Sequence, residues 1–105
     1  MKSYGLGWSP HRNHINLYTG ADWILERTNP DGIFPPGTSI EIKWENGQTW
    51  PGSIDGDTVS WRVESATVAL VPDQTEFTIW VRYPNAETST TDDYPWIIGA
   101  ARYQQ

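Results

Sequence analysis

The sequence predicts an all-β fold, a small antiparallel β-sandwich of about seven strands. Apolar and polar residues alternate in several short runs, which places one face of each predicted strand against a core. Turn-forming Gly, Pro, Asn and Asp residues separate these runs at intervals of roughly 8–12 residues. Isoleucine, valine and threonine are common whereas leucine is scarce, a usage typical of β-structure.

The 105 residues are sufficient for one domain with one hydrophobic core. We expect residues 1–13 to form an extended N-terminal arm and residues 14–105 to form the β-sandwich. The sandwich begins with HINLYTGADWILERT, which predicts two short strands that break at Thr19–Gly20. Two turn signals follow, NPDG at 29–32 and FPPG at 34–37.

The middle of the chain predicts a β-hairpin. SIEIKWE (39–45) alternates cleanly, so its isoleucines and its tryptophan share one face. Asn46–Gly47 follows at once, a strong hairpin signal because both residues tolerate positive φ. We expect residues 48–54 to be the return strand, with Pro51 marking an edge or a bulge.

Two further strands are predicted in the C-terminal half, TVSWRVE (58–64) and TEFTIWVRYP (75–84). Residues 65–74 between them are either a single helical turn or a crossover loop. The polar residues 85–93 predict a long mobile loop. PWIIGAARY (95–103) predicts the last strand.

Composition excludes several classes of protein. The net charge of −6 and the lack of a basic stripe argue against nucleic-acid binding. The chain has no cysteine, so disulfides and thiolate sites are excluded, in keeping with a reducing compartment. The first residues lack the apolar core of a secretory signal, and no apolar run approaches the ~20 residues that span a bilayer. We therefore expect a soluble protein that binds neither nucleic acid nor membrane.

No arrangement of residues predicts catalysis, a cofactor or a metal site. Asp55–Gly56–Asp57 lacks the further oxygen ligands of a calcium loop, and a tight turn explains it better. His11 and His14 are too few for a zinc site. Neither a nucleophile motif nor a carboxylate pair at a forced separation is present. We expect a protein that is not an enzyme.

The seven tryptophans are the unusual feature of the composition. Trp44, Trp61 and Trp23 are in phase with aliphatic neighbours, so we expect them in the core. The others are less obviously internal, and could bury themselves against another subunit or stack on a sugar. These interaction candidates are Trp8, Trp50, Trp80 and Trp96.

Several short motifs follow one another in an order that resembles a known family. They are Gly20-Ala21-Asp22, Phe34-Pro35 with Gly37, Val71-Pro72-Asp73, Tyr83-Pro84 and Pro95-Trp96. In this order, over residues 17 to 103, the chain is similar to the LtfC-like β-sandwich proteins that phages of actinobacteria encode among their tail genes. The plan also resembles immunoglobulin-like sandwiches and the N-terminal sandwich of some phage baseplate proteins.

The resemblance implies a virion component, associated with the tail or baseplate, that is assembled in the host cytoplasm and has no catalytic residues. It implies that Asp22 accepts backbone N–H groups where a strand begins and that Gly37 supplies a turn. The turn and motif residues expected to be structural are Gly20, Asp22, Pro35, Gly37, Asn46, Gly47, Pro72 and Asp73.

The partners that this interpretation implies are other phage tail or virion proteins and further copies of the chain itself. Open strand edges and outward tryptophans could be covered by such neighbours. The alternative is a carbohydrate-binding module, a host-surface adhesin whose exposed tryptophans stack on a host glycan. The sequence leaves both open.

Overall fold

The computed structural model describes residues 10–85 and 87–104. Within them the chain is almost entirely β-structure in two sheets, which confirms the predicted small β-sandwich. In chain order the elements are β1 His11–Arg12, β2 Ile15–Tyr18, β3 Trp23–Thr28, β4 Ser39–Trp44, β5 Thr49–Pro51, β6 Ser53–Asp55, β7 Thr58–Val63, α1 Ser65–Val68, β8 Glu76–Asn85 and β9 Thr90–Gln104.

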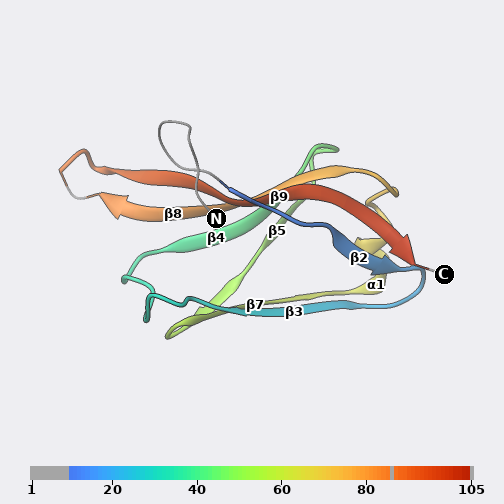
Figure 1. Cartoon of the computed structure of the whole chain (residues 1–105), viewed down its shortest axis with the longest axis horizontal. Coiled ribbons are helices and arrows are strands. Elements are labelled where there is room, and N and C mark those ends of the chain that lie inside the picture. Colours follow the sequence, from blue (N-terminus) through green and yellow to red (C-terminus); the bar gives the residue numbers. More distant parts are fainter. Residues whose placement is uncertain (1–9, 86, 105) are drawn as a thin grey trace.

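The two sheets differ in size. The larger has six strands in the order β1-β9-β8-β4-β5, with β2 also beside β9, and the smaller has three in the order β3-β7-β6. Figure 1 shows them as an upper and a lower layer, with β3 in the lower layer beneath β1 and β2. Three strands cannot cover the inner face of six, so part of that face lies at an open side of the sandwich.

Two pairings correct the expectation of a purely antiparallel sandwich. β1 runs parallel to β9 with His11 opposite Ile97, and β2 runs parallel to β9 with Ile15 opposite Ala101. β1 and β2 follow one another along the same edge of β9, and the chain then crosses to the other layer to form β3. Alternation predicts which face a strand buries and gives no information about its partner or its direction.

The step from β1 to β2 passes directly over Gly99 of β9. The Asn13 N–H donates to the Ile98 carbonyl at 3.0 Å. A Cβ built on Gly99 would lie 1.6 Å from the Asn13 carbonyl oxygen and 2.8 Å from its carbon. These are backbone atoms, which cannot move aside by rotation of a side chain. Glycine is therefore required where the N-terminal strands cross β9.

The predicted return strand 48–54 is in fact two strands in different sheets. β5 pairs with β4 in the larger sheet, whereas β6 pairs with β7 in the smaller one. The corner is Gly52, whose N–H donates to the Ile40 carbonyl at 2.8 Å. A Cβ on Gly52 would lie 2.7 Å from a methyl carbon of Val59 and 3.0 Å from the ring of Trp61. The chain can turn between layers here because this position has no side chain.

The hairpin at Asn46–Gly47 is present, but with a different turn. Only Gly47 has positive φ, +98°, and Asn46 does not. The Gly47 N–H donates to the Trp44 carbonyl and the Trp44 N–H to the Gln48 carbonyl, which closes a three-residue loop. The Asn46 side chain instead accepts the Gln48 N–H and donates to the Leu70 carbonyl at 2.8 Å. Asn46 thus ties the hairpin to the segment after α1.

The prediction of a long mobile loop at 85–93 is wrong. β8 extends to Asn85 and β9 begins at Thr90, opposite it, so the connection is only residues 86–89. The two strands project beyond the sandwich as a two-stranded hairpin (Figure 1, orange and red). Strand pairing uses backbone groups, so a polar, threonine-rich segment can form it where both faces meet water.

The faces predicted for β4, β7 and β8 were confirmed, whereas residues 11–12 of the expected arm form β1 beside β9, and residues 1–9 lie outside the described part of the chain. Ile40, Ile42 and Trp44 all point into the core, and Trp61 is 2 % exposed. Trp23 packs against the core and is partly buried. The segment 65–74, left open between a helical turn and a loop, contains the four-residue helix α1. The described part of the chain has no helix of a length and apolarity that could cross a membrane.

Candidate protein-interaction surface

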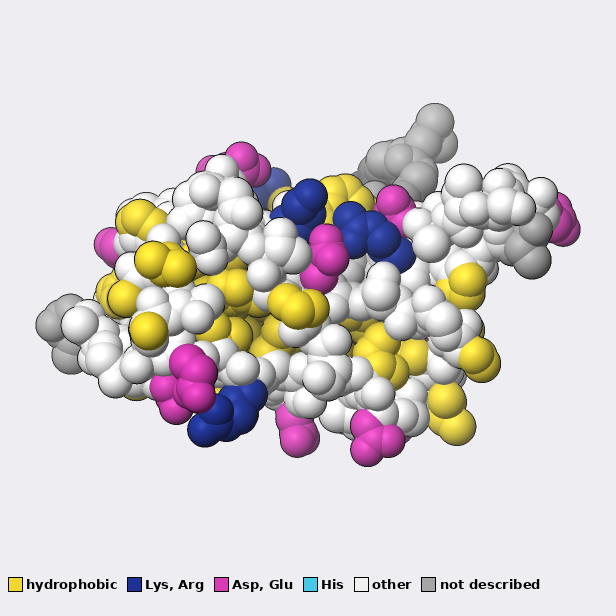
Figure 2. All heavy atoms as spheres, turned by 180° about the vertical axis from the view of Figure 1, so that it is seen from behind, with side chains coloured by type: hydrophobic (Ala, Val, Ile, Leu, Met, Phe, Trp, Pro, Cys, Tyr) yellow, Lys and Arg dark blue, Asp and Glu magenta, His cyan; other side chains and the backbone are white. Residues whose placement is uncertain are grey.

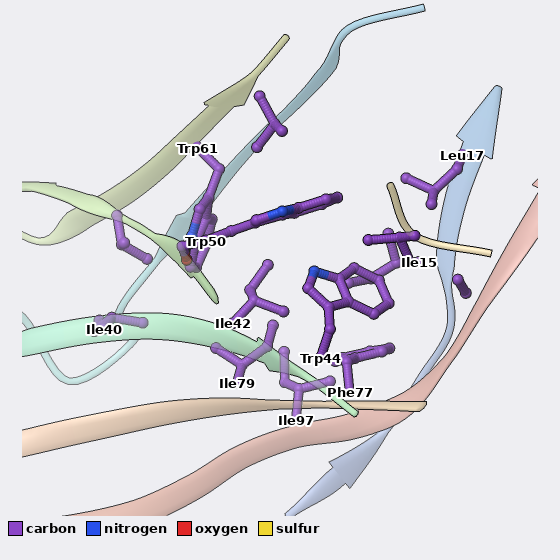
Figure 3. Close-up of a cluster of buried hydrophobic side chains, with 14 of the residues drawn as sticks. Ile15, Leu17, Ile40, Ile42, Trp44, Trp50, Trp61, Phe77, Ile79 and Ile97 are labelled. Carbon is purple, nitrogen blue, oxygen red and sulfur yellow. Dashed lines mark hydrogen bonds between the residues drawn. The ribbon is translucent and has the colours of Figure 1, made fainter. Parts of the chain in front are cut away.

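Trp50 does not lie on the surface, contrary to prediction. Its side chain is 3 % exposed, and its ring centroid lies 4.9 Å from that of Trp44 and 5.5 Å from that of Trp23 (Figure 3). Its carbonyl accepts the indole N–H of Trp61 at 3.0 Å. The reason is register: Trp50 is the cross-strand partner of Ile42, so both side chains project from the same, inward face.

Trp80 is half-buried on the outer face of the larger sheet. The guanidinium carbon of Arg82 lies 5.9 Å from the ring centroid, within reach of a cation–π contact. Arg82 also pairs with Glu41 at 2.8 Å and with Asp93 at 3.6 Å. We call these four residues the Trp80 patch. The patch presents an aromatic ring, and ion pairs hold the charged side chains beside it in place.

Trp96 points to the opposite face of the same sheet. β9 has a bulge here, because Ile79 pairs with Ile97 and Trp80 pairs with Pro95, which leaves Trp96 without a partner residue in the register with β8. Trp96 packs against the core and is partly buried, and it lines a hollow together with the buried Phe34 and Val81. Trp8 lies outside the described residues. Of the four candidates, one is in the core and two lie on opposite faces. The three that the structure describes do not form the coplanar aromatic platform that a stacked sugar requires.

The open side of the sandwich is a groove along the edge of β3 with which no strand of the described residues pairs. A hollow of about 170 Å³ between β2 and the start of β3 has Phe77, Ile79 and Ile97 on its floor. A second hollow, of about 410 Å³, adjoins it at Arg27. A third, of about 170 Å³, shares Trp96 with the second. We call this surface the β3 groove, and its lining includes Trp23, Leu25, Arg27, Pro30, Tyr83 and Trp96.

The groove could not be predicted from the sequence, because it results from the unequal number of strands in the two sheets. Alternation within a single strand predicts that its apolar face is covered by the other layer. β3 pairs with β7 on one side, and among the described residues it has no strand on the other. Its backbone N–H and C=O groups along that edge can accept another strand.

The FPPG motif forms a turn against the end of β8. The Thr38 N–H donates to the Pro35 carbonyl at 3.1 Å and Gly37 has φ of +86°, the geometry of a type II turn with proline before the glycine. A Cβ on Gly37 would lie 3.2 Å from the ring of Pro84. The FPPG and Tyr83–Pro84 motifs therefore meet in space.

Asp22 accepts a backbone N–H, but at α1 and not where a strand begins. Its Oδ1 accepts the Ser65 N–H at 2.8 Å, and its other oxygen lies 3.7 Å from Arg62. Gly20, with φ of +83°, turns the chain two residues earlier. The GAD motif thus carries the chain from β2 into β3 and anchors that corner to the start of α1.

The Val71–Pro72–Asp73 motif holds the end of β9. Asp73 Oδ1 accepts the Tyr103 N–H at 2.9 Å. The Tyr103 hydroxyl donates to the carbonyls of Val68 and Val71. The hydrogen bond from the Tyr103 N–H lowers the pKa of Asp73, and burial together with the Asp73 charge raises the pKa of Tyr103.

The lowered pKa of Asp73 predicts a loss of stability in acid. Because the folded value lies below the ordinary 3.8, Asp73 stabilises the fold above pH 3.8, and this contribution is lost as the pH falls through the folded value. In urea unfolding at a series of pH values, Asp73→Asn should be less stable than wild type near neutrality. The difference should shrink in acid.

The matched control for this prediction is Asp31→Asn, which removes a carboxylate from another exposed turn. If Asp73→Asn and wild type differ by a constant amount from neutral to strongly acidic pH, the charge of Asp73 does not stabilise the end of β9.

No described cluster of side chains resembles a catalytic or metal centre. Among the residues that the structure describes, no three His, Cys, Asp or Glu side chains lie close enough together to hold a metal ion. His11 and His14 are both exposed. On the face seen in Figure 2, the basic side chains are few and lie beside acidic ones, so this face has no basic stripe.

Comparison with known proteins identifies the kind of domain. The family model described as "LtfC-like, beta-sandwich domain" matches residues 9–104, nearly the whole chain. No curated protein matches the chain at a significant level.

Proposed function

The chain belongs to the family of LtfC-like β-sandwich domains, and from this premise we propose that it is a non-enzymatic structural protein of a phage virion. In this proposal it is a tail or baseplate-associated component whose task is to bind other proteins. It is assembled in the host cytoplasm and acts in the particle. Its partners are other tail or virion proteins and further copies of itself.

The observation that carries this proposal is the β3 groove. It combines an apolar lining that includes the partly buried Trp23, Leu25 and Trp96 with an edge strand that lacks a neighbour among the described residues, and it runs the length of β3. Both features suit an extended polypeptide better than a small molecule. In a subunit of a multicopy assembly, a neighbour can cover such a surface.

The Trp80 patch supports the same role. Interfaces between proteins are enriched in tryptophan and arginine, and both are present here in contact. The ion pairs of Arg82 with Glu41 and Asp93 hold the guanidinium over the ring. A partner that binds here meets an ordered surface and loses little side-chain entropy.

The test is incorporation into particles. A phage that lacks the gene is grown in cells that supply the protein, and purified particles are analysed by mass spectrometry. We expect the wild-type protein in the particle fraction. Trp80→Ala should reduce the amount per particle by about tenfold, the factor that corresponds to about 1.4 kcal/mol of binding free energy.

The matched control is Ile33→Ala, which removes an apolar side chain that is 77 % exposed and lies outside both surfaces. This variant should be incorporated like wild type. Particles that assemble normally without the protein, and never contain it, would overturn the proposed role.

A further inference from the structure

We infer that the third hollow of the β3 groove binds the guanidinium group of an arginine side chain of a partner protein. The inference rests on the proposed function, since it names the chemistry with which a partner would occupy part of the same surface. It draws on the size of the hollow, on the aromatic rings and the carboxylate that line it, and on the surroundings of Arg82 on the outer face of the larger sheet.

Aromatic side chains form most of the lining of this hollow. It lies at the end of the sandwich from which the β8–β9 hairpin projects (Figure 1). The buried Phe34 and Val81 border it, and so do three half-buried aromatic residues, Tyr83, Tyr94 and Trp96. The ring centroids of Tyr83 and Tyr94 lie 6.0 Å apart, with the ring planes tilted by 57°. A group that enters the hollow is therefore surrounded by rings from β8, β9 and the segment after β3.

The size of the hollow suits one side chain better than a whole small-molecule ligand. Its volume is about 170 Å³, whereas pockets for drug-sized ligands measure about 300–1,000 Å³. A planar group at the end of a flexible side chain can enter such a space while the rest of the partner chain lies outside it, along β3.

The charges around the hollow favour a cation. The exposed carboxylate of Asp31 borders it, and none of the described residues that line it is a lysine or an arginine. Asp31 has no ion-pair partner in the part of the chain that the structure describes. Arg27 borders the adjoining hollow, where Glu26 is also present and opposes its charge. Aromatic rings attract cations as well, so the rings and the carboxylate select the same kind of group.

The turn after β3 fixes the position of this carboxylate. The Asn29 side-chain oxygen accepts the Asp31 N–H at 3.1 Å, and the Asn29 N–H donates to the Asp57 carbonyl at 2.7 Å. The Phe34 N–H donates to the Gly56 carbonyl at 3.0 Å, which ties the other end of the segment to the same turn of the smaller sheet. Asp31 is thus held beside the hollow before a partner binds, which reduces the entropy lost on binding.

The outer face of the larger sheet already holds a guanidinium in the same chemical surroundings. The guanidinium carbon of Arg82 lies 5.9 Å from the ring centroid of Trp80, and its nitrogens pair with carboxylates at 2.8 and 3.6 Å. The hollow combines the same two kinds of group, aromatic rings and a carboxylate. A guanidinium suits them better than the ammonium of lysine, because it is planar, stacks on rings and can pair with a carboxylate through two N–H groups.

The experiment titrates the purified protein with Nα-acetyl-arginine N-methylamide and follows the indole N–H signals by NMR. His11 also borders the hollow, so the titration is made at about pH 8, where an ordinary imidazole is uncharged. The Trp96 signal should shift and saturate, with a dissociation constant of roughly millimolar size, and the Trp80 signal should stay in place. The citrulline derivative has nearly the same shape without the charge and should bind at least about fivefold more weakly. The lysine derivative should also bind more weakly than the arginine derivative.

Two pairs of variants test the lining. Asp31→Asn should weaken binding of the arginine derivative by about threefold, whereas Asp55→Asn removes the same charge from an exposed residue outside the hollow and should leave binding unchanged. Tyr83→Leu should weaken it by about threefold, whereas Tyr83→Phe keeps the ring and should bind like wild type. An unchanged signal from the buried indole of Trp61 in each variant establishes that the core is intact.

Equal binding of the arginine and citrulline derivatives would overturn the inference, as would binding that Asp31→Asn and Tyr83→Leu leave unchanged. Equal binding of the lysine derivative would overturn the choice of a guanidinium. If the arginine derivative does not bind but the protein is incorporated into particles, the virion role stands and only this inference fails. Absence from particles would overturn the virion role instead, whatever the titration gives.

Discussion

Replacement of Gly99 by alanine is expected to destabilise the protein more than any other change of similar size, by at least about 3 kcal/mol. The new methyl group would lie 1.6 Å from the Asn13 carbonyl oxygen. To remove this clash, β1 and β2 must move away from β9, which breaks their parallel pairing with it. Urea unfolding followed by circular dichroism measures the loss, and a variant that fails to fold at all agrees with the same prediction.

Gly56→Ala is the matched control. Gly56 has φ of +63°, and a Cβ added there would meet no other atom within 4 Å, so alanine adds backbone strain without a clash. It should cost about 1–2 kcal/mol. A Gly99→Ala protein that unfolds at the wild-type urea concentration would show that β1 and β2 do not cross β9 at this residue.

Replacement of Trp50 by alanine is the second large effect, with an expected loss of about 3–5 kcal/mol. The side chain fills the space between Trp23 and Trp44, and its removal leaves a cavity that rigid sheets cannot close. Trp50→Phe should cost less than Trp50→Ala. The indole N–H of Trp50 is buried without a hydrogen-bond partner, so replacement by phenylalanine reduces the volume of the side chain but breaks no hydrogen bond.

Trp80→Ala is the control for Trp50→Ala, because it removes the same side chain from the outer face. Equal losses of unfolding free energy at the two positions would contradict the assignment of Trp50 to the core and of Trp80 to the surface. A much smaller loss of unfolding free energy for Trp80→Ala than for Trp50→Ala would agree with this assignment.

The faces of the long strands could be predicted from the sequence because periodicity follows directly from backbone geometry. β4, β7 and β8 bury the residues that alternation selects. The family could also be recognised from short motifs, and the match over residues 9–104 confirms it. These motifs are informative because each forms a corner, such as the type II turn at Gly37.

The faces of the short strands could not be predicted in the same way. β5 has three residues, too few for a pattern, and Trp50 between Thr49 and Pro51 has the sequence context of a turn neighbour. Its inward direction is set by Ile42 across the sheet, a pairing that sequence order does not encode. The corner at Gly52 was missed for a related reason: the glycine is required by Val59 and Trp61, which lie later in the chain.

The candidate site was predicted only in part. Trp80 and Trp96 are both partly accessible, but which face each occupies depends on the register of β8 with β9. The groove depends on the unequal number of strands in the two layers, which no local pattern reveals.

The parallel pairing of β1 and β2 with β9 also has a consequence for synthesis. β1 and β2 leave the ribosome before β9, the strand with which they pair, and the paired residues are more than 80 positions apart in the sequence. The chain loses conformational entropy when so long a loop closes, and the contacts that offset this loss form only afterwards. Folding should therefore be slow for a chain of this size. Until β9 has emerged, β8 presents an open edge to other nascent chains, and dilution or a chaperone should raise the yield of folded protein.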